Sequence, residues 1–143
     1  MIVYFDTSAI VPIVIEEPSS MVASPLWDEA DRVVSSRLVY AEGRAALAMA
    51  RRLDRLDERG LREAVDDLES LHDQLDVIEV TDGLIRDAGG LAEQLSLRGY
   101  DAVHLASARL VDDPEMVLAA GDQSLLAAAR ALGIATADLT HRT

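Results

Sequence analysis

The sequence contains no cysteine, which excludes disulfide bonds, thiol nucleophiles and zinc sites with cysteine ligands, and which fits a reducing cytoplasm. It also has no long hydrophobic segment. The longest apolar run extends from Ala9 to Ile15, far short of the roughly 20 residues that a membrane-spanning helix needs. The N-terminus has no basic region and carries Asp6, Glu16 and Glu17, unlike a signal peptide. These absences predict a soluble cytoplasmic protein without a membrane partner.

Lysine is absent as well, and all thirteen basic residues are arginines. A response-regulator receiver domain needs a lysine after a late strand, and the Gly-x-x-x-x-Gly-Lys phosphate loop ends on one, so both classes are excluded. A haloacid-dehalogenase-type phosphatase needs a second acid two positions after its first, and Ser8 occupies that place after Asp6. The first predicted strand and the Asp6 that follows it therefore do not belong to a receiver domain, a phosphate-loop protein or a phosphatase of this type.

Half of the residues are apolar, and a chain of 143 residues is long enough to bury a hydrophobic core. We expect one compact domain over residues 1–143. Short apolar runs alternate with longer segments of helical periodicity, which predicts an α/β fold with a parallel sheet covered on both faces. The predicted strands are 2–5, 32–35, 77–80, 116–119 and 134–136, and the predicted helices begin near Thr7, Ser20, Ser36, Asp57, Thr81, Asp101 and Gln123.

Four acids lie in apolar or small-residue surroundings: Asp6, Glu42, Asp101 and Asp122. A carboxylate is costly to bury unless its charge is compensated, and the sequence offers few cations near these positions. Asp6 and Asp122 follow predicted strands, so both are expected at the carboxyl edge of the sheet, where open α/β folds bind ligands. A hard divalent metal such as Mg²⁺, with Mn²⁺ as a substitute, would compensate clustered carboxylates and could serve phosphodiester hydrolysis.

Each of these acids also has a purely structural explanation. Asp6, Asp101 and Asp122 stand at predicted helix starts, where aspartate is a favoured N-cap, and Glu42 could be a surface residue of its helix. Capping is likewise the simpler role for Thr7 and Ser8, and packing the simpler role for His104. Capping does not account for all four acids converging on one edge, and that convergence favours function.

The formal net charge of −13 is unusual for a protein that binds nucleic acid. Arginine is nevertheless concentrated between Arg32 and Arg62, which contain eight of the thirteen basic residues. Two interpretations stay open for this stretch: a solvated helical surface, or a basic strip beside an anionic pocket that holds an RNA backbone. The acidic remainder of the chain would favour a basic protein partner.

Four segments, taken in order, resemble the successive motifs of PIN-domain ribonucleases, and among them the VapC toxins of type II toxin–antitoxin pairs. These segments are 4–9 (Tyr-Phe-Asp-Thr-Ser-Ala), Glu42 in its helix, 97–106 (Leu-Arg-Gly-Tyr-Asp-Ala-Val-His-Leu-Ala) and 120–125 (Ala-Gly-Asp-Gln-Ser-Leu). The run from Tyr100 to Ala106 is the most specific of them. One departure is Gly121, at a position where the family often carries a larger residue.

The resemblance implies a three-layer α/β/α fold with a five-stranded parallel sheet, and a Mg²⁺-dependent endoribonuclease that hydrolyses RNA. It implies Asp6, Glu42, Asp101 and Asp122 as the catalytic and metal-binding acids, with Asp6 and Asp101 foremost as direct ligands. It further implies a homodimer and a VapB-type antitoxin whose basic C-terminal tail reaches the site. The alternative is a PIN-like module that binds RNA or protein without cutting.

Overall fold

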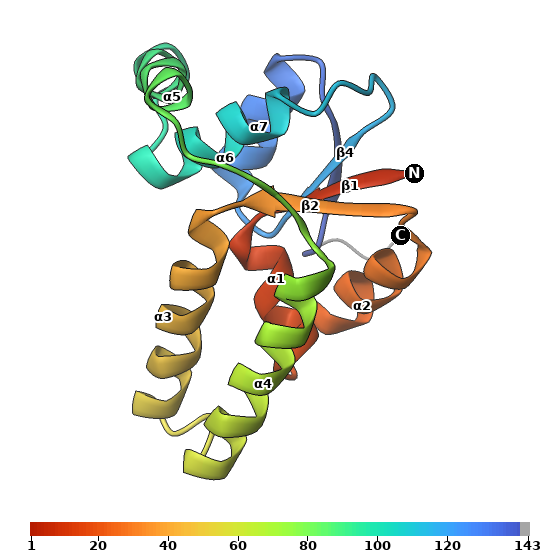
Figure 1. Cartoon of the computed structure of the whole chain (residues 1–143), viewed down its shortest axis with the longest axis vertical. Coiled ribbons are helices and arrows are strands. Elements are labelled where there is room, and N and C mark those ends of the chain that lie inside the picture. The colour runs from red at the N-terminus through yellow and green to blue at the C-terminus, as the bar shows by residue number, and fades with distance from the viewer. Residues whose placement is uncertain (141–143) are drawn as a thin grey trace.

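The computed structural model describes residues 1–140, and within them five strands alternate with seven helices (Figure 1). In chain order the elements are β1 (Ile2–Phe5), α1 (Thr7–Val14), α2 (Ser20–Glu29), β2 (Arg32–Ser36), α3 (Leu38–Arg52), α4 (Glu58–Gln74), β3 (Asp76–Ile78), α5 (Asp82–Leu95), α6 (Gly99–Arg109), β4 (Val117–Ala120), α7 (Gln123–Ala131) and β5 (Ala135–Asp138). None of the helices in this part of the chain combines the length and apolar character needed to cross a membrane.

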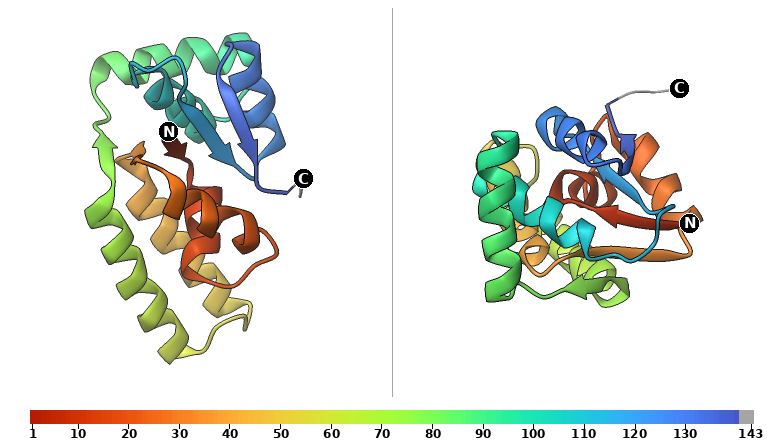
Figure 2. Two further views of the ribbon diagram at one scale, coloured as in Figure 1. Left: turned by 90° about the vertical axis from the view of Figure 1, so that its right-hand side faces the viewer. Right: turned by 90° about the horizontal axis from the view of Figure 1, so that it is seen from above.

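The five strands form one parallel sheet in the order β3-β2-β1-β4-β5 (Figure 2). β1 lies at the centre, with Val3 opposite Val33 of β2 on one side and opposite Val117 of β4 on the other. Because every strand runs in the same direction, all five carboxyl ends meet at one edge of the sheet. This edge receives the residues that follow β1 and β4.

Helices cover both faces of the sheet, as Figure 1 shows with α1 to α4 on one side and α5 to α7 on the other. Successive residues of β1 supply the two cores, because side chains of a strand alternate between its faces. Val3 and Phe5 pack against α1, α3 and α4, whereas Tyr4 packs against α6 and α7 with Leu105 and Leu125. All five side chains are buried, so β1 is apolar on both faces, as expected for an interior parallel strand.

The predicted α/β architecture with a parallel sheet is confirmed, and the strand boundaries differ from the predicted ones by at most two residues. The sequence predicts that the helix beginning near Thr81 runs to about Leu97 and is broken by Arg98 and Gly99, and the structure has this break two residues earlier. α5 ends earlier, at Leu95, where Ser96 adopts the left-handed conformation with φ of 55°, and Gly99 is the first residue of α6. The turn is therefore made by a serine that local sequence preferences do not single out.

Two predicted helix caps also differ from the structure. Ser36 is predicted as the cap of the helix that contains Glu42, but it belongs to β2, and its hydroxyl accepts a hydrogen bond from the N–H of Leu38. Thr7 and Ser8 are the first two residues of α1 rather than its cap. By contrast Thr81 caps α5 as predicted, because its hydroxyl accepts from the N–H of Leu84.

Two glycines allow a matched test of helix and turn conformation. Gly90→Ala, in the interior of α5 with nothing within 4 Å of the added methyl group, is expected to raise the free energy of unfolding by about 0.5–1 kcal/mol. Gly133→Ala meets equally open space but at φ of +78°, so the same methyl group should destabilise the protein. Thermal unfolding of both variants checks the opposite signs, and equal shifts would contradict the assignment of Gly133 to a left-handed turn.

Candidate active site

The four acids reach the carboxyl edge of the sheet from four different elements. Asp6 follows β1, and Asp122 follows the neighbouring strand β4. Asp101 is the third residue of α6, and Glu42 is the fifth residue of α3. Asp6 and Asp101 are buried, and the side chains of Asp122 and Glu42 are about three-quarters buried. The three aspartates interact at this edge, and Glu42 reaches it through a hydrogen bond with Thr7, the residue after Asp6.

Asp6 is held by hydrogen bonds that link the ends of the two central strands. The hydroxyl of Ser8 donates to Oδ1 of Asp6 at 2.6 Å and accepts from the N–H of Gly121 at 2.7 Å. Burial raises the pKa of Asp6 to about 6, and the nearby charges of Asp101 and Asp122 act in the same direction. These charge interactions place the three aspartates within electrostatic reach of one another.

Arg98, directly before α6, bridges two of the acids. Its Nε donates to Oδ2 of Asp101 at 3.1 Å, and its Nη2 donates to Oδ2 of Asp122 at 3.0 Å. These bonds raise the pKa of Arg98, with the hydrogen bond to Asp101 as the first cause. The expectation that the acids have too few cations nearby is therefore incomplete. The missed signal is the spacing, because a residue three positions before Asp101 at a helix start lies beside it.

Glu42 belongs to a second group of hydrogen bonds, which reaches into the core. Its Oε1 accepts from the hydroxyl of Thr7 at 2.9 Å and lies 2.7 Å from Nε2 of the buried His104. Burial acts to raise the pKa of Glu42, but the bonds from His104 and Thr7 outweigh it and hold the pKa below its usual value. An ionised carboxylate only accepts, so the proton between them lies on Nε2.

The other ring nitrogen of His104 continues this group. Nδ1 lies 2.8 Å from the hydroxyl of Tyr4, a fully buried residue of β1, and the two rings meet edge to face. His104 thus connects the centre of the sheet to Glu42. The sequence favours a packing role for His104, and the structure gives it both burial and a direct contact with Glu42.

Capping explains one of the three aspartates rather than all of them. Asp122 caps α7, since its Oδ1 accepts from the N–H of Leu125 at 3.0 Å. Asp6 occupies the cap position of α1, but its side chain makes no capping bond, and Asp101 lies inside α6. Thr7 and Ser8 bond the site acids instead of capping a helix. Capping therefore does not explain the burial of Asp6 and Asp101.

The glycine at position 121 is compatible with the site. A Cβ atom added there would lie 3.6 Å from Oγ of Ser8, which is an ordinary contact, and the backbone of Gly121 is not in the left-handed region. An alanine would therefore fit at position 121 without moving Ser8.

The donor set suits a hard divalent cation, because carboxylate oxygens are the ligands that Mg²⁺ and Mn²⁺ prefer. With the side chains of residues 1–140 in their present conformations, however, no group of three or more histidines or acids is arranged to hold a metal ion. The guanidinium of Arg98 lies between Asp101 and Asp122, and His104 and Thr7 engage Glu42. The residues fit a metal by chemistry, although a metal on Asp101 and Asp122 would compete with Arg98 for their Oδ2 atoms.

The arginines between Arg32 and Arg62 are mostly neutralised by neighbouring acids. Six of the eight lie within ion-pair distance of an aspartate or glutamate: Arg32, Arg37, Arg51, Arg55, Arg59 and Arg62. A seventh, Arg44, donates to the hydroxyl of Tyr40 and stacks over its ring. This pattern agrees with the interpretation of a charged helical surface.

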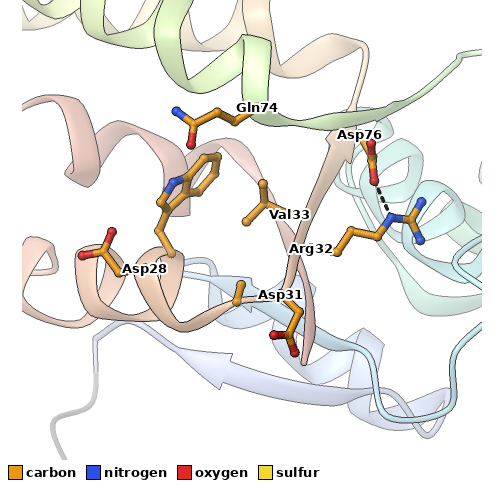
Figure 3. A pocket seen from close by; sticks show the side chains of 8 residues that line it. Asp28, Asp31, Arg32, Val33, Gln74 and Asp76 are labelled. Atoms are coloured by element: carbon orange, nitrogen blue, oxygen red, sulfur yellow. Dashed lines mark hydrogen bonds and ion pairs between the residues drawn. The ribbon is translucent and has the colours of Figure 1, made fainter.

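A hollow of about 420 Å³ lies at the opposite edge of the sheet, where β2 and β3 begin (Figure 3). Three of its charged residues have partners: Asp31 pairs with the N-terminal ammonium group of Met1, and Arg32 pairs with Asp76. None of the four site acids lines it. This hollow is therefore separate from the candidate active site.

Comparison with known proteins gives consistent matches along the chain. Residues 3–139 match the model of the PIN domain family. Ribonuclease VapC45 of Mycobacterium tuberculosis (strain CDC 1551 / Oshkosh) is 46% identical over 132 residues, which are 92% of each protein. FitAcB from Neisseria gonorrhoeae has a TM-score of 0.71 at 17% identity over 98% of this chain and 99% of that one. A toxin–antitoxin complex from Klebsiella pneumoniae contains a chain with a TM-score of 0.59 at 14% identity, covering 84% and 86%.

Proposed function

Because the chain belongs to the PIN-domain family, in its VapC branch, we propose that it is a Mg²⁺-dependent endoribonuclease that hydrolyses RNA phosphodiester bonds as the toxin of a VapBC-type pair. The observation that carries this proposal is the convergence of Asp6, Glu42, Asp101 and Asp122 from four elements on one edge of the sheet. The name of the relative VapC45 supports RNA as the substrate. An RNA-cleaving toxin would act in the cytoplasm.

We assign the metal to the acids, with Asp6 and Asp101 as the foremost ligands and Glu42 and Asp122 completing the set. A divalent ion bound there would supply Lewis-acid stabilisation of the charge on the reacting phosphate. The protein contributes the fixed positions of the carboxylates: Ser8 orients Asp6, and Thr7 and His104 orient Glu42. Substrate phosphate adds further negative charge, so cations at the site are essential for RNA to approach a chain with a net charge of −13.

We further propose a VapB-type antitoxin with a basic C-terminal tail as partner. The net charge of −13 favours a basic partner, and the Klebsiella relative of the fold is described as part of a toxin–antitoxin complex. A homodimer is supported by an apolar hollow of about 390 Å³ between α5 and α6, where Ile85 and Tyr100 are exposed. The first two residues of α6, Gly99 and Tyr100, line this hollow, and none of the four acids does.

The proposed activity predicts that the purified chain cleaves RNA with Mg²⁺ present, loses cleavage when the metal is chelated, and regains it when Mg²⁺ is restored in excess. Cleavage of a labelled RNA resolved on a gel provides the measurement. A Glu42→Gln variant taken through the same purification should be far less active, which excludes a co-purifying nuclease. Tight RNA binding without cleavage at any metal concentration would instead establish the binding module.

A further inference from the structure

Arg98 makes a contact that the proposed activity does not explain. Its guanidinium uses two nitrogens of one edge, Nε and Nη2, to join Asp101 of α6 with Asp122 after β4. Its side chain is 78% exposed, whereas the carboxylate of Asp101 is 10% exposed. A solvent-facing cation therefore binds two acids that are otherwise largely removed from water.

On Asp122, Arg98 occupies the oxygen that a metal would need. Oδ1 of Asp122 is already committed to the cap of α7 through the N–H of Leu125, which leaves Oδ2 as its available oxygen. That atom accepts from Nη2 of Arg98 at 3.0 Å. A divalent cation bound to Oδ2 would bring two positive charges next to the guanidinium, and like charges a few ångströms apart repel strongly in a partly buried site.

We propose that Arg98 is an exchangeable internal counter-ion, which holds Asp101 and Asp122 together in the metal-free protein and is displaced from them when a divalent metal binds. This inference rests on the metal site of the proposed function. Displacement costs little elsewhere, because the side chain is exposed and a helix start needs no side-chain bond from position 98. The negative charges of Asp101 and Asp122 would thereby be balanced both in the metal-free protein, by Arg98, and in the metal-bound protein, by the metal.

If the exchange occurs, removing Arg98 should change the stability of the metal-free protein and its affinity for metal in opposite directions. Without its counter-ion, the metal-free protein leaves Asp101 and Asp122 unpaired and should become less stable. Metal binding, in contrast, no longer has to displace the guanidinium and should become tighter. A residue with a purely structural role would lower both stability and metal affinity, so the opposite signs identify the exchange.

Arg98→Gln is expected to lower the dissociation constant for Mn²⁺ about three- to tenfold, measured by isothermal titration calorimetry without RNA. Its thermal midpoint in EDTA should fall by about 1–3 °C, and the deficit should disappear in saturating Mn²⁺. Arg98→Lys keeps the charge but loses the two-nitrogen bridge, so its Mn²⁺ affinity should lie between those of Arg98→Gln and the unmodified protein.

The matched control is Arg86→Gln, which removes an equally exposed arginine that pairs with Asp82 on α5, away from the acids. It corrects for the change in net charge and should leave the affinity for Mn²⁺ nearly unchanged. Equal or weaker Mn²⁺ binding by Arg98→Gln, or no Mn²⁺ binding by the unmodified protein, would overturn the inference. Because this titration uses no RNA, its failure is distinguishable from a failure of RNA cleavage.

Discussion

Asp101→Asn is expected to lower the rate of RNA cleavage by at least about a hundredfold while the protein stays folded. Asp101 is buried beside Asp122 and within electrostatic reach of Asp6, so its charge is central to the candidate metal site. The asparagine keeps the size of the side chain and can still accept a hydrogen bond from Arg98. It removes the negative charge that a divalent metal requires, and the loss should therefore be in activity rather than in folding.

The measurement is the initial rate of cleavage of one labelled RNA at saturating Mg²⁺, with folding checked by circular dichroism and thermal unfolding. Asp67→Asn is the matched control, since it makes the same chemical change on the exposed side of α4. Its rate should equal that of the unmodified protein. Undiminished cleavage by Asp101→Asn would remove this residue from the catalytic set and contradict the proposed site.

Asp6→Asn is expected to make the metal-free protein more stable, by about 3 kcal/mol at pH 7.5. Burial raises the pKa of Asp6 to about 6, so the folded state binds a proton more tightly than the unfolded state, whose carboxyl has an ordinary pKa near 3.8. The charged form of Asp6 therefore lowers the free energy of unfolding. This destabilisation is absent below pH 3.8, grows as the pH rises from 3.8 to about 6, and is complete above about 6. Asparagine carries no charge at any of these pH values, so the Asp6→Asn protein is not destabilised in this way.

Thermal unfolding in EDTA should show the Asp6→Asn protein melting about 10 °C above the unmodified protein at pH 7.5, with the gap narrowing as the pH falls from 7 toward 4. Added Mg²⁺ or Mn²⁺ should raise the midpoint of the unmodified protein and leave that of Asp6→Asn unchanged. A gap that is independent of pH would contradict the raised pKa. Equal metal-induced shifts in the two proteins would exclude Asp6 from metal binding.

The fold follows from sequence patterns that are local and strong. Short apolar runs such as Ile2–Phe5 predict strands because both of their faces are buried, and the long Ala- and Leu-rich segments predict helices by their periodicity. The boundaries are harder to predict, because a cap depends on single bonds. Ser96 ends α5 in a left-handed conformation that most serines do not adopt, while the neighbouring Gly99 carries the conventional breaking signal but begins α6.

The site acids are identifiable from the sequence because each one interrupts an apolar segment. Their partners are not, since Glu42 and His104 are 62 positions apart, and Ser8 and Gly121 are 113 positions apart. Such contacts depend on how the helices pack on the sheet, which no local pattern encodes. Arg98 is hidden for another reason: an exposed arginine at a helix start is ordinary, and only its two carboxylate partners make it distinctive.

The central position of β1 has a consequence for how the site responds to heat. β1 is hydrogen-bonded to a neighbour on each side and is buried on both faces, so its amide groups reach water only when the whole sheet opens. Asp6 directly follows this strand, and its own N–H bonds to the carbonyl of Ala119 in β4. The end of β1 and Asp6 should therefore keep their positions until the whole protein unfolds, whereas the edge strands β3 and β5 can fray without disturbing them.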